Sequence, residues 1–194
     1  MSGQTSSAAS QTGAATTDQP PLHYSDALIL RILSEVKTIA MVGASAKEIR
    51  PSYFVLKYLL AKGFSVIPVN PGLAGKEILG QTVYPDLTSI PGPIDMVDIF
   101  RSAEAVPGIV TEALALAPLP KVIWMQLTVR QDEAAAKAQA AGITVIMDRC
   151  PKIEYGRLSR EIGWNGVNSR VLSSKKPKLG KGYQSFGLNP ARRD

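Results

Sequence analysis

The amino-acid sequence predicts a Rossmann-like α/β fold, a doubly wound parallel sheet of about five strands in a three-layer αβα arrangement with flexible termini. Five short apolar runs alternate with segments of helical periodicity, a pattern typical of parallel strands joined by right-handed helical crossovers. The chain has 194 residues, of which 45% are hydrophobic, enough for one buried core. We therefore expect a single domain, with the strand order 3-2-1-4-5 counted along the chain.

The first half of the expected domain contains two helices and two strands. They are a helix over 25–36, a strand over 39–42, a helix over 51–62 and a strand over 64–69. Ser25 can cap the first helix, and Pro51 is the residue type favoured at the first helical position. Gly63 is a good C-terminal stop for the second helix. The segment from Gly43 to Pro51 is therefore a turn between a strand and a helix.

The second half repeats the alternation. Its expected elements are a short extended piece over 82–84, strands over 94–100, 121–127 and 144–148, and helices over 102–116, 131–141 and 152–160. Ser102 can cap the first of these helices, with Pro107 in its first turn or two. Gly142 again marks a C-terminal stop.

Composition separates this domain, expected over residues 22–164, from two tails. Residues 1–21 are rich in Ser, Thr, Ala and Gln and are expected to be a disordered leader. Residues 165–194 are rich in Gly, Lys, Ser and Pro and are expected to be a basic flexible tail. The formal charge of +6 comes from this end, because residues 164–194 hold seven Lys or Arg against one acid.

The rare residue types exclude several kinds of chemistry. Cys150 and His23 are the only cysteine and histidine, so an intrachain disulfide and a His/Cys metal cluster are excluded. The same scarcity argues against Ser-His-Asp and Cys-His catalysis. Asp148 and Glu154 have no base partner and are expected to be capping or surface groups, so no catalytic residue is predicted. Without a long apolar run or a signal peptide, we expect a cytoplasmic protein with no membrane partner.

The candidate binding site lies where the strands end. Ligands of open parallel sheets bind outside the carboxyl ends of the strands at the switch point, here expected beside the first and fourth strands. The segment GASAKEIRPS after the first strand combines small residues with the free amides of a helix start, which attract phosphate. Lys47 and Arg50 add positive charge. The alternative is that Gly43 only turns the chain and that both cations are solvated surface.

A dinucleotide enzyme is the natural competitor, and two features speak against it. The fingerprint G-x-G-x-x-G is absent. The second strand ends in Pro-Val-Asn-Pro, with no Asp or Glu to hold a ribose 2′-hydroxyl. An adenosine that carries an extra phosphate would therefore be accommodated.

Five motifs in order together resemble the stand-alone CoA-binding domain family, which is related to the CoA-binding domain of the succinyl-CoA synthetase α subunit. They are VGAS at 42–45, PVNP at 68–71, VDIFR at 97–101, WMQL at 124–127 and MDRCPKIEYGRL at 147–158. The likeness covers about residues 28–158. It implies a Rossmann-like domain that holds coenzyme A. One departure is Thr128, since the WMQL motif of the family is usually followed by Gly.

The resemblance also implies where the cofactor lies. The pyrophosphate would lie at Gly43, Ala44 and Ser45 and at the helix start near Arg50, Pro51 and Ser52. Val69, Asn70 and Pro71 would border the adenosine half, and Phe100 and Arg101 would lie along the ligand. Met125 and Gln126 would line the route of the pantetheine arm. Lys47 and Cys150 complete the set of expected cofactor-binding residues.

Two of these residues have alternative interpretations. Cys150 could form a mixed disulfide with the coenzyme A thiol, with Arg149 lowering its pKa, or it could be a buried small hydrophobic side chain. Arg101 could pair with a phosphate, or form an ion pair with Asp98 or Glu104.

The basic tail also has two interpretations. Its cluster KKPKLGK could contact nucleic acid or anionic lipid through phosphate charge. No recognised nucleic-acid module is present, so a solubilising tail is favoured and a nucleic-acid partner is not expected.

The sequence thus predicts a small coenzyme A-binding protein without catalytic apparatus, acting as a carrier, sensor or regulatory module. The competing hypotheses are an NAD(P)- or acyl-CoA-linked enzyme and a subunit of a CoA ligase. A homodimer or another protein partner stays open at this point.

Overall fold

The computed structural model describes residues 22–159, so the expected leader, the expected tail and residues 160–164 lie outside the described residues. Its elements are α1 (Asp26–Glu35), β1 (Thr38–Val42), α2 (Pro51–Ala61), β2 (Ser65–Val69), η1 (Pro71–Leu73), β3 (Glu77–Ile78), β4 (Gln81–Thr82), β5 (Met96–Ile99), η2 (Ala103–Ala105), α3 (Val106–Leu114), β6 (Val122–Met125), α4 (Asp132–Ala140), β7 (Thr144–Ile146) and α5 (Pro151–Leu158).

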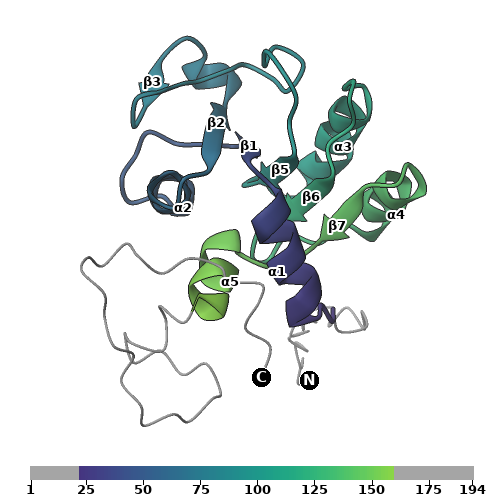
Figure 1. The fold of residues 1–194 in the computed structure, drawn as a ribbon. Coiled ribbons are helices and arrows are strands. Elements are labelled where there is room, and N and C mark those ends of the chain that lie inside the picture. The colour runs from purple at the N-terminus through teal and green to yellow at the C-terminus, as the bar shows by residue number, and fades with distance from the viewer. Residues whose placement is uncertain (1–21, 160–194) are drawn as a thin grey trace, which may run out of the picture.

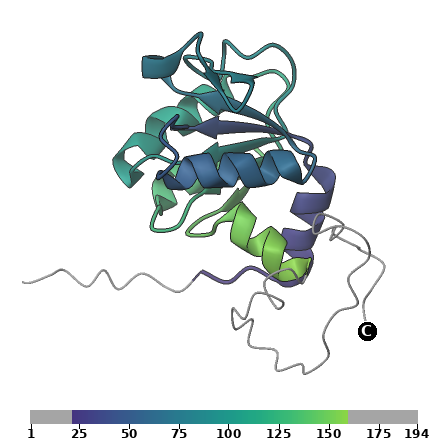
Figure 2. The same cartoon turned by 90° about the vertical axis from the view of Figure 1, so that its left-hand side faces the viewer.

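The expected fold class is confirmed. Five parallel strands form one sheet in the order β2-β1-β5-β6-β7. Helices α3 and α4 cover one face, and α1, α2 and α5 cover the other (Figure 1). Figure 2 shows α2 in front of the strands and running in roughly the same direction as they do. The α/β alternation predicted from the apolar runs therefore produces three layers.

The predicted strand order is wrong. Counted along the chain, the five strands lie in the order 2-1-3-4-5, because β5 pairs with β1 on the side away from β2. The third strand was expected beyond β2. In the structure, part of the connection between β2 and β5 lies there instead. Tyr84 of this connection forms a parallel bridge to Val69, and its amide donates to the Pro68 carbonyl over 2.9 Å. The strand order therefore reverses between β1 and β5, which moves the switch point there.

The local signals for helix ends are mostly confirmed. The Ser25 hydroxyl accepts a hydrogen bond from the Leu28 amide over 3.2 Å, and Pro51 is the first residue of α2. Gly63 adopts a φ of 88° after α2, a left-handed conformation that suits glycine. Ser102 is an exception, because it precedes the short 3-10 helix η2 and makes no side-chain cap, while α3 begins at Val106.

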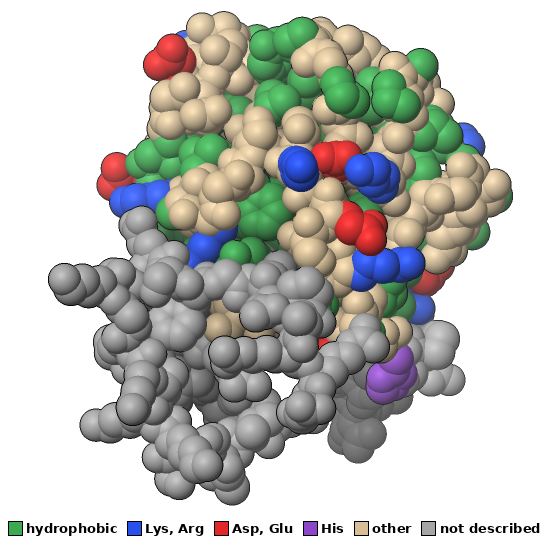
Figure 3. All heavy atoms as spheres, viewed as in Figure 1, with side chains coloured by type: hydrophobic (Ala, Val, Ile, Leu, Met, Phe, Trp, Pro, Cys, Tyr) green, Lys and Arg blue, Asp and Glu red, His purple; other side chains and the backbone are tan. Residues whose placement is uncertain are grey.

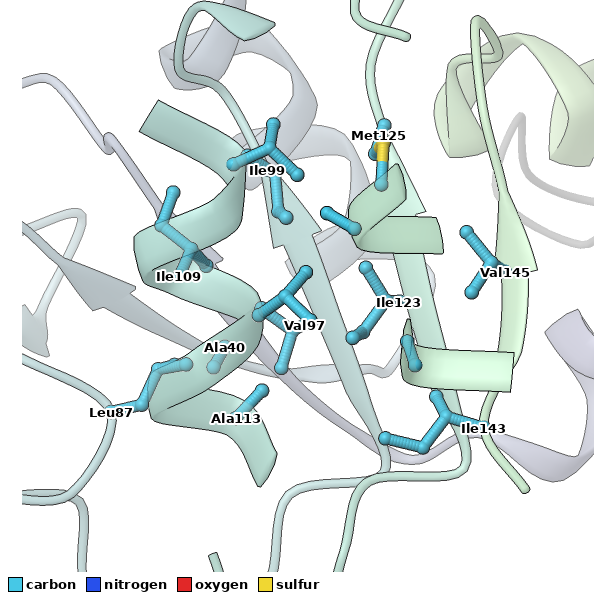
Figure 4. Packing of buried hydrophobic residues seen from close by; sticks show 14 of the residues in the cluster. Ala40, Leu87, Val97, Ile99, Ile109, Ala113, Ile123, Met125, Ile143 and Val145 are labelled. Carbon is cyan, nitrogen blue, oxygen red and sulfur yellow. The ribbon is translucent and has the colours of Figure 1, made fainter. Parts of the chain in front are cut away.

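Two hydrophobic clusters fill the spaces between the layers. The cluster on the α3 and α4 side includes the inward-facing residues shown in Figure 4: Ala40, Leu87, Val97, Ile99, Ile109, Ala113, Ile123, Met125, Ile143 and Val145. The other cluster packs β1, β2, β5, β6 and β7 against α1, α2 and α5 and contains the fully buried Trp124. Because side chains alternate along a strand, neighbours such as Trp124 and Met125 belong to different clusters.

Candidate functional site

The β1–α2 turn lies against the end of β5. Gly43 has a φ of 89°, and a Cβ added to it would lie 2.5 Å from the Phe100 carbonyl oxygen and 2.9 Å from Cδ of Arg101. Only glycine fits so close to another backbone in this conformation. Gly43 is therefore required by the meeting of β1 and β5 at the switch point, whether or not a ligand is bound.

The first amides of the turn are already hydrogen-bonded. Both the Gly43 amide and the Ala44 amide donate to the Val69 carbonyl, over 2.9 and 3.3 Å. Ala44 and Val69 are buried, so they form the floor of the turn. Any anion that binds to backbone donors here must use amides beyond Ala44.

Asn70 holds this turn to β2. Its Nδ2 donates to the Ala44 carbonyl over 2.8 Å, and its Oδ1 accepts from the Gly72 amide over 2.9 Å. The next residue, Pro71, is exposed at the start of η1. Asn70 is therefore a structural link between β2 and the β1–α2 turn, and Pro71 presents an apolar surface beside it.

The start of α2 has unused donor capacity. Arg50 occupies the N-cap position without a side-chain cap, and Pro51 has no N–H. The Tyr53 and Phe54 amides donate to the Arg50 carbonyl, whereas the Ser52 amide has no acceptor within the described part of the chain. The first turn of α2 also contains no acid. This end of the helix therefore offers an N–H and a positive dipole to an anion.

Two cations, Lys47 and Arg50, lie next to this helix start in the chain, and a third, Arg101, lies against Gly43 in the turn before it. Lys47, Arg50 and Arg101 are exposed, and none of them forms an ion pair with another residue in 22–159. The alternative ion pairs expected for Arg101 are absent in 22–159. Asp98 is fully buried and bonded to Gln126. Glu104 interacts with the Ser102 hydroxyl instead, and this hydrogen bond lowers the pKa of Glu104. Ser45 lies within the same turn, where its Oγ accepts the Lys47 amide over 3.2 Å.

The two residues expected along the pantetheine route face opposite sides of the sheet. Met125 is fully buried and points into the cluster of Ile99, Ile123 and Val145 on the α3 and α4 side (Figure 4). Gln126 is 6% exposed, and its side chain reaches Asp98 on the side of α2 and α5. Phe100 is half-buried on that same side. Gln126 and Phe100 therefore lie on the side of the sheet that α2 covers, whereas the Met125 side chain lies on the opposite side.

Asp98 is a polar residue of this region that sequence reasoning did not propose. It is fully buried, its Oδ1 accepts from Gln126 Nε2 over 2.8 Å, and burial raises its pKa to about 7. The available signal was an acid in the middle of the otherwise apolar run of β5. A carboxylic acid without a cation is costly to bury, so its presence requires an explanation.

Cys150 matches the alternative interpretation, a buried small hydrophobic side chain. It is 7% exposed and packs within the cluster that contains Trp124 and Tyr155. Burial raises the pKa of its thiol, and the expected lowering by Arg149 is wrong. The Arg149 guanidinium instead donates to the Asp148 and Leu22 carbonyls. The thiol is therefore held in its protonated, less nucleophilic form.

The remaining acids near the site also have structural partners. Asp148 Oδ1 accepts the Thr128 amide over 2.8 Å, and Glu154 Oε2 pairs with the Arg157 guanidinium. Thr128 has a φ of 68° and Asp148 a φ of 51°, both in the left-handed region. Thr128 stands where the family usually has Gly, and its main effect is on the backbone. A β-branched residue is strained at this positive φ, whereas glycine is not.

Two wider properties of the described residues bear on partners. None of the helices in 22–159 is long and apolar enough to cross a membrane. On the face drawn in Figure 3, acidic and basic side chains lie beside each other and form no continuous basic area. The basic cluster predicted at 165–194 lies outside the described residues.

Comparison with known proteins identifies the domain. A family model described as CoA binding domain matches residues 37–156, which run from the start of β1 into α5. The uncharacterized protein YneT of Bacillus subtilis is 40% identical over 132 residues, covering 68% of this chain and 94% of YneT. An ADP-forming acetate–CoA ligase of Archaeoglobus fulgidus is 28% identical over 147 residues, covering 72% of this chain but only 21% of the ligase.

Solved structures agree with these sequence matches. A hypothetical protein from Pyrococcus horikoshii is 37% identical, with a TM-score of 0.67 over 73% of this chain and 97% of that protein. The protein cell-free ID.343 from Thermus thermophilus is 36% identical, with a TM-score of 0.64 over 68% of this chain and 96% of that protein. Because the family model spans more than half of the sequence, this chain belongs to the CoA binding domain family.

Proposed function

We propose that this protein binds coenzyme A, as the free thiol or as an acyl thioester, at the carboxyl ends of β1 and β5. The observation that carries the proposal is the uncapped start of α2, where the Ser52 amide lacks an acceptor and three cations lack ion-pair partners within 22–159. A phosphate group supplies the acceptors and the negative charge that these groups are missing. Membership of the CoA binding domain family supports the choice of ligand.

The parts of the ligand can be assigned to parts of the site. The diphosphate would lie between Ser45 and Ser52, with Lys47, Arg50 and Arg101 around it. The adenosine half would lie over Asn70 and Pro71, since the strand end Pro68 to Pro71 contains no carboxylate that would repel an additional phosphate. The pantetheine arm would pass Phe100 and Gln126.

We further propose a carrier, sensor or regulatory role without catalysis. Asp148 and Glu154 are committed to structural hydrogen bonds and ion pairs. Asp98 is fully buried, and burial raises the pKa of the Cys150 thiol. Neither Asp98 nor Cys150 therefore combines exposure with a pKa suited to general base or nucleophilic catalysis.

A role as part of a CoA ligase is the second candidate. It is favoured by the match to the acetate–CoA ligase of A. fulgidus, of which this chain spans 21%. In that case the remaining parts of the catalyst would be supplied by other chains. Addition of acetate, nucleotide and coenzyme A to the isolated protein should then give no turnover.

Thermal unfolding with added ligands tests coenzyme A binding. Coenzyme A and acetyl-CoA should raise the midpoint, because a ligand that binds only the folded state stabilises it, whereas NAD and NADP should not. A rise with NAD alone would overturn the proposal.

A charge reversal tests the location of the site. Arg50→Glu should weaken coenzyme A binding by about tenfold, because it places a carboxylate at the proposed diphosphate position. Lys57→Glu is the matched control, since Lys57 is also an exposed cation on the same helix but lies beyond its first turn. Equal effects of the two variants on affinity would indicate long-range charge rather than a local site.

A further inference from the structure

Asp98 lies on the central strand of the sheet, two residues before Phe100. Its strand, β5, is flanked by β1 and β6, and in the sheet register Asp98 stands beside Met41 on one side and Trp124 on the other. Met96, two residues earlier, belongs to the cluster beneath α2 and α5, so Asp98 faces the same side. Both in-register neighbours are apolar and fully buried. The carboxyl group therefore sits in an apolar layer next to the switch point.

Gln126 is the hydrogen-bond partner of Asp98. The Nε2 group of Gln126 donates to Asp98 Oδ1 over 2.8 Å. In this contact Asp98 Oδ1 is the acceptor, so the amide nitrogen of Gln126 faces Asp98 and the amide oxygen is turned away from it. Asp98 therefore selects one of the two orientations of the Gln126 amide.

The backbone of Gln126 is held as well. Its amide donates to the Ile99 carbonyl over 3.3 Å, and its carbonyl accepts from the Val129 amide over 2.9 Å. With the main chain held at both groups, the freedom that remains is in the side-chain torsions, which include the orientation of the amide. The bond to Asp98 removes that freedom.

The amide oxygen of Gln126 is left as an unused acceptor. No donor in residues 22–159 is bonded to Gln126 Oε1. Gln126 is 6% exposed, so a small part of this residue reaches the surface. A ligand that passes Gln126 would therefore meet a fixed hydrogen-bond acceptor.

We propose that Asp98 is a positioning residue, which holds the Gln126 amide so that Oε1 accepts a hydrogen bond from an amide N–H of the pantetheine arm. This inference rests on the proposed coenzyme A site. It assigns recognition of the arm to a group separate from the cations around α2. The arm carries secondary amides, whose N–H groups are donors that a fixed carbonyl oxygen can select.

The energetic cost of Asp98 supports such a role. An apolar residue of similar size would pack between Met41 and Trp124 without the penalty of burying a carboxyl group. Burial raises the pKa of Asp98, which shows that its charged form is disfavoured there. The cost of burying Asp98 is explained if the orientation that it gives to the Gln126 amide is used in ligand binding.

The first test uses the wild-type protein. Coenzyme A should shift the NMR resonances of the Gln126 side-chain amide. The nucleotide half alone, adenosine 3′-phosphate 5′-diphosphate, should leave these resonances unchanged while it shifts the Ser52 amide. If both ligands shift the Gln126 amide equally, or if neither does while both bind, the inference is wrong.

The second test separates the two halves of the ligand in variants. The ratio of the dissociation constant of adenosine 3′-phosphate 5′-diphosphate to that of coenzyme A measures what the arm contributes. In Asp98→Leu this ratio should fall by about five- to tenfold, because the amide of Gln126 is no longer held. Asp98→Asn keeps an acceptor for Nε2 and should restore most of the ratio. Met96→Leu, on the same strand and face, is the matched control and should leave it unchanged.

The outcomes distinguish this inference from the proposed function. If the wild-type protein binds neither ligand, the coenzyme A site itself is wrong. If it binds coenzyme A more tightly than the nucleotide half, and Asp98→Leu keeps that ratio, only the positioning role of Asp98 is wrong. A loss of affinity for both ligands by the same factor in Asp98→Leu would show a general structural role and would also overturn the inference.

Discussion

Helices α2 and α5 start in similar ways but with different consequences. Each follows a strand of the sheet, lies on the same face, begins with proline and has an N-cap residue without a side-chain cap. At α2 the cap residue Arg50 and Pro51 are exposed, and the first turn holds no acid. At α5 the cap residue Cys150 and Pro151 are buried, and Glu154 lies in the first turn.

The difference shows that a helix start is not by itself an anion site. The dipole is present at both helices, but at α5 an acid occupies the first turn and the cap residue is buried. Trp124 Nε1 and the Arg149 carbonyl further close that region with a hydrogen bond of 2.8 Å. Of these two helices, only α2 combines a backbone N–H that lacks an acceptor within 22–159 with exposed cations beside it. Variants at each start, and at Asp98 on the same face of the sheet, test this contrast.

The largest expected effect is at the glycine that precedes the open helix start. Gly43→Ala should destabilise the fold by about 4 to 5 kcal/mol, because the new Cβ would lie 2.5 Å from the Phe100 carbonyl oxygen in a backbone of positive φ. Gly63→Ala is the matched control, with a φ of 88° and nothing within 4 Å of the added Cβ, and should cost only about 1 kcal/mol. Urea unfolding measures both, and equal losses would contradict the close approach of β1 and β5.

Asp98 should give stability a specific pH dependence. Its pKa rises from 3.8 to about 7 on folding because of burial, so between these pH values the folded state binds more protons than the unfolded state. The stabilisation that the bound proton provides is therefore lost as pH rises through about 7.

Comparison with Asp98→Asn isolates this contribution. Relative to the variant, the wild-type free energy of unfolding should fall by roughly 3 kcal/mol between pH 5 and pH 8. Other carboxylates, such as Asp26 with its lowered pKa, cancel in the difference. A difference that does not change with pH would mean that Asp98 has an ordinary pKa in the folded protein.

The closed start of α5 depends on Arg157. Its guanidinium pairs with Glu154 Oε2 and makes a bidentate contact with Asp26 of α1 at 2.8 and 2.9 Å. Arg157→Ala should cost about 1 to 2 kcal/mol, mainly because the 8% exposed Glu154 loses its close partner. Arg31→Ala, an exposed arginine on α1, is the control in urea unfolding. Similar stabilities of the two variants would indicate that the pairs contribute little.

The smallest expected effect concerns the strained turn after β6. Thr128→Gly should stabilise the protein by about 1 kcal/mol, because glycine adopts a φ of 68° without the steric cost that a β-branched residue bears. Its amide can still donate to Asp148. Unchanged or reduced stability in urea unfolding would show that the Thr128 side chain makes a compensating contact.

The elements and the fold class could be predicted from the sequence because their signals are local. Ser25 and Pro51 act within one helical turn, and Gly63 ends a helix through its own backbone. The apolar strands are nearly continuous, which marks a sheet covered on both faces. Together these features determined a parallel α/β domain and the loop in which the candidate site lies.

Only the tertiary structure decided the strand order and the roles of individual site residues. The order depends on which edge of β1 receives β5, a contact between segments far apart in the chain. The opposite orientations of Met125 and Gln126, the raised pKa of Cys150 and the burial of Asp98 depend on neighbours from other strands and helices. Burial and pairing are properties of the assembled layers, so residue type and spacing along the chain could not determine them.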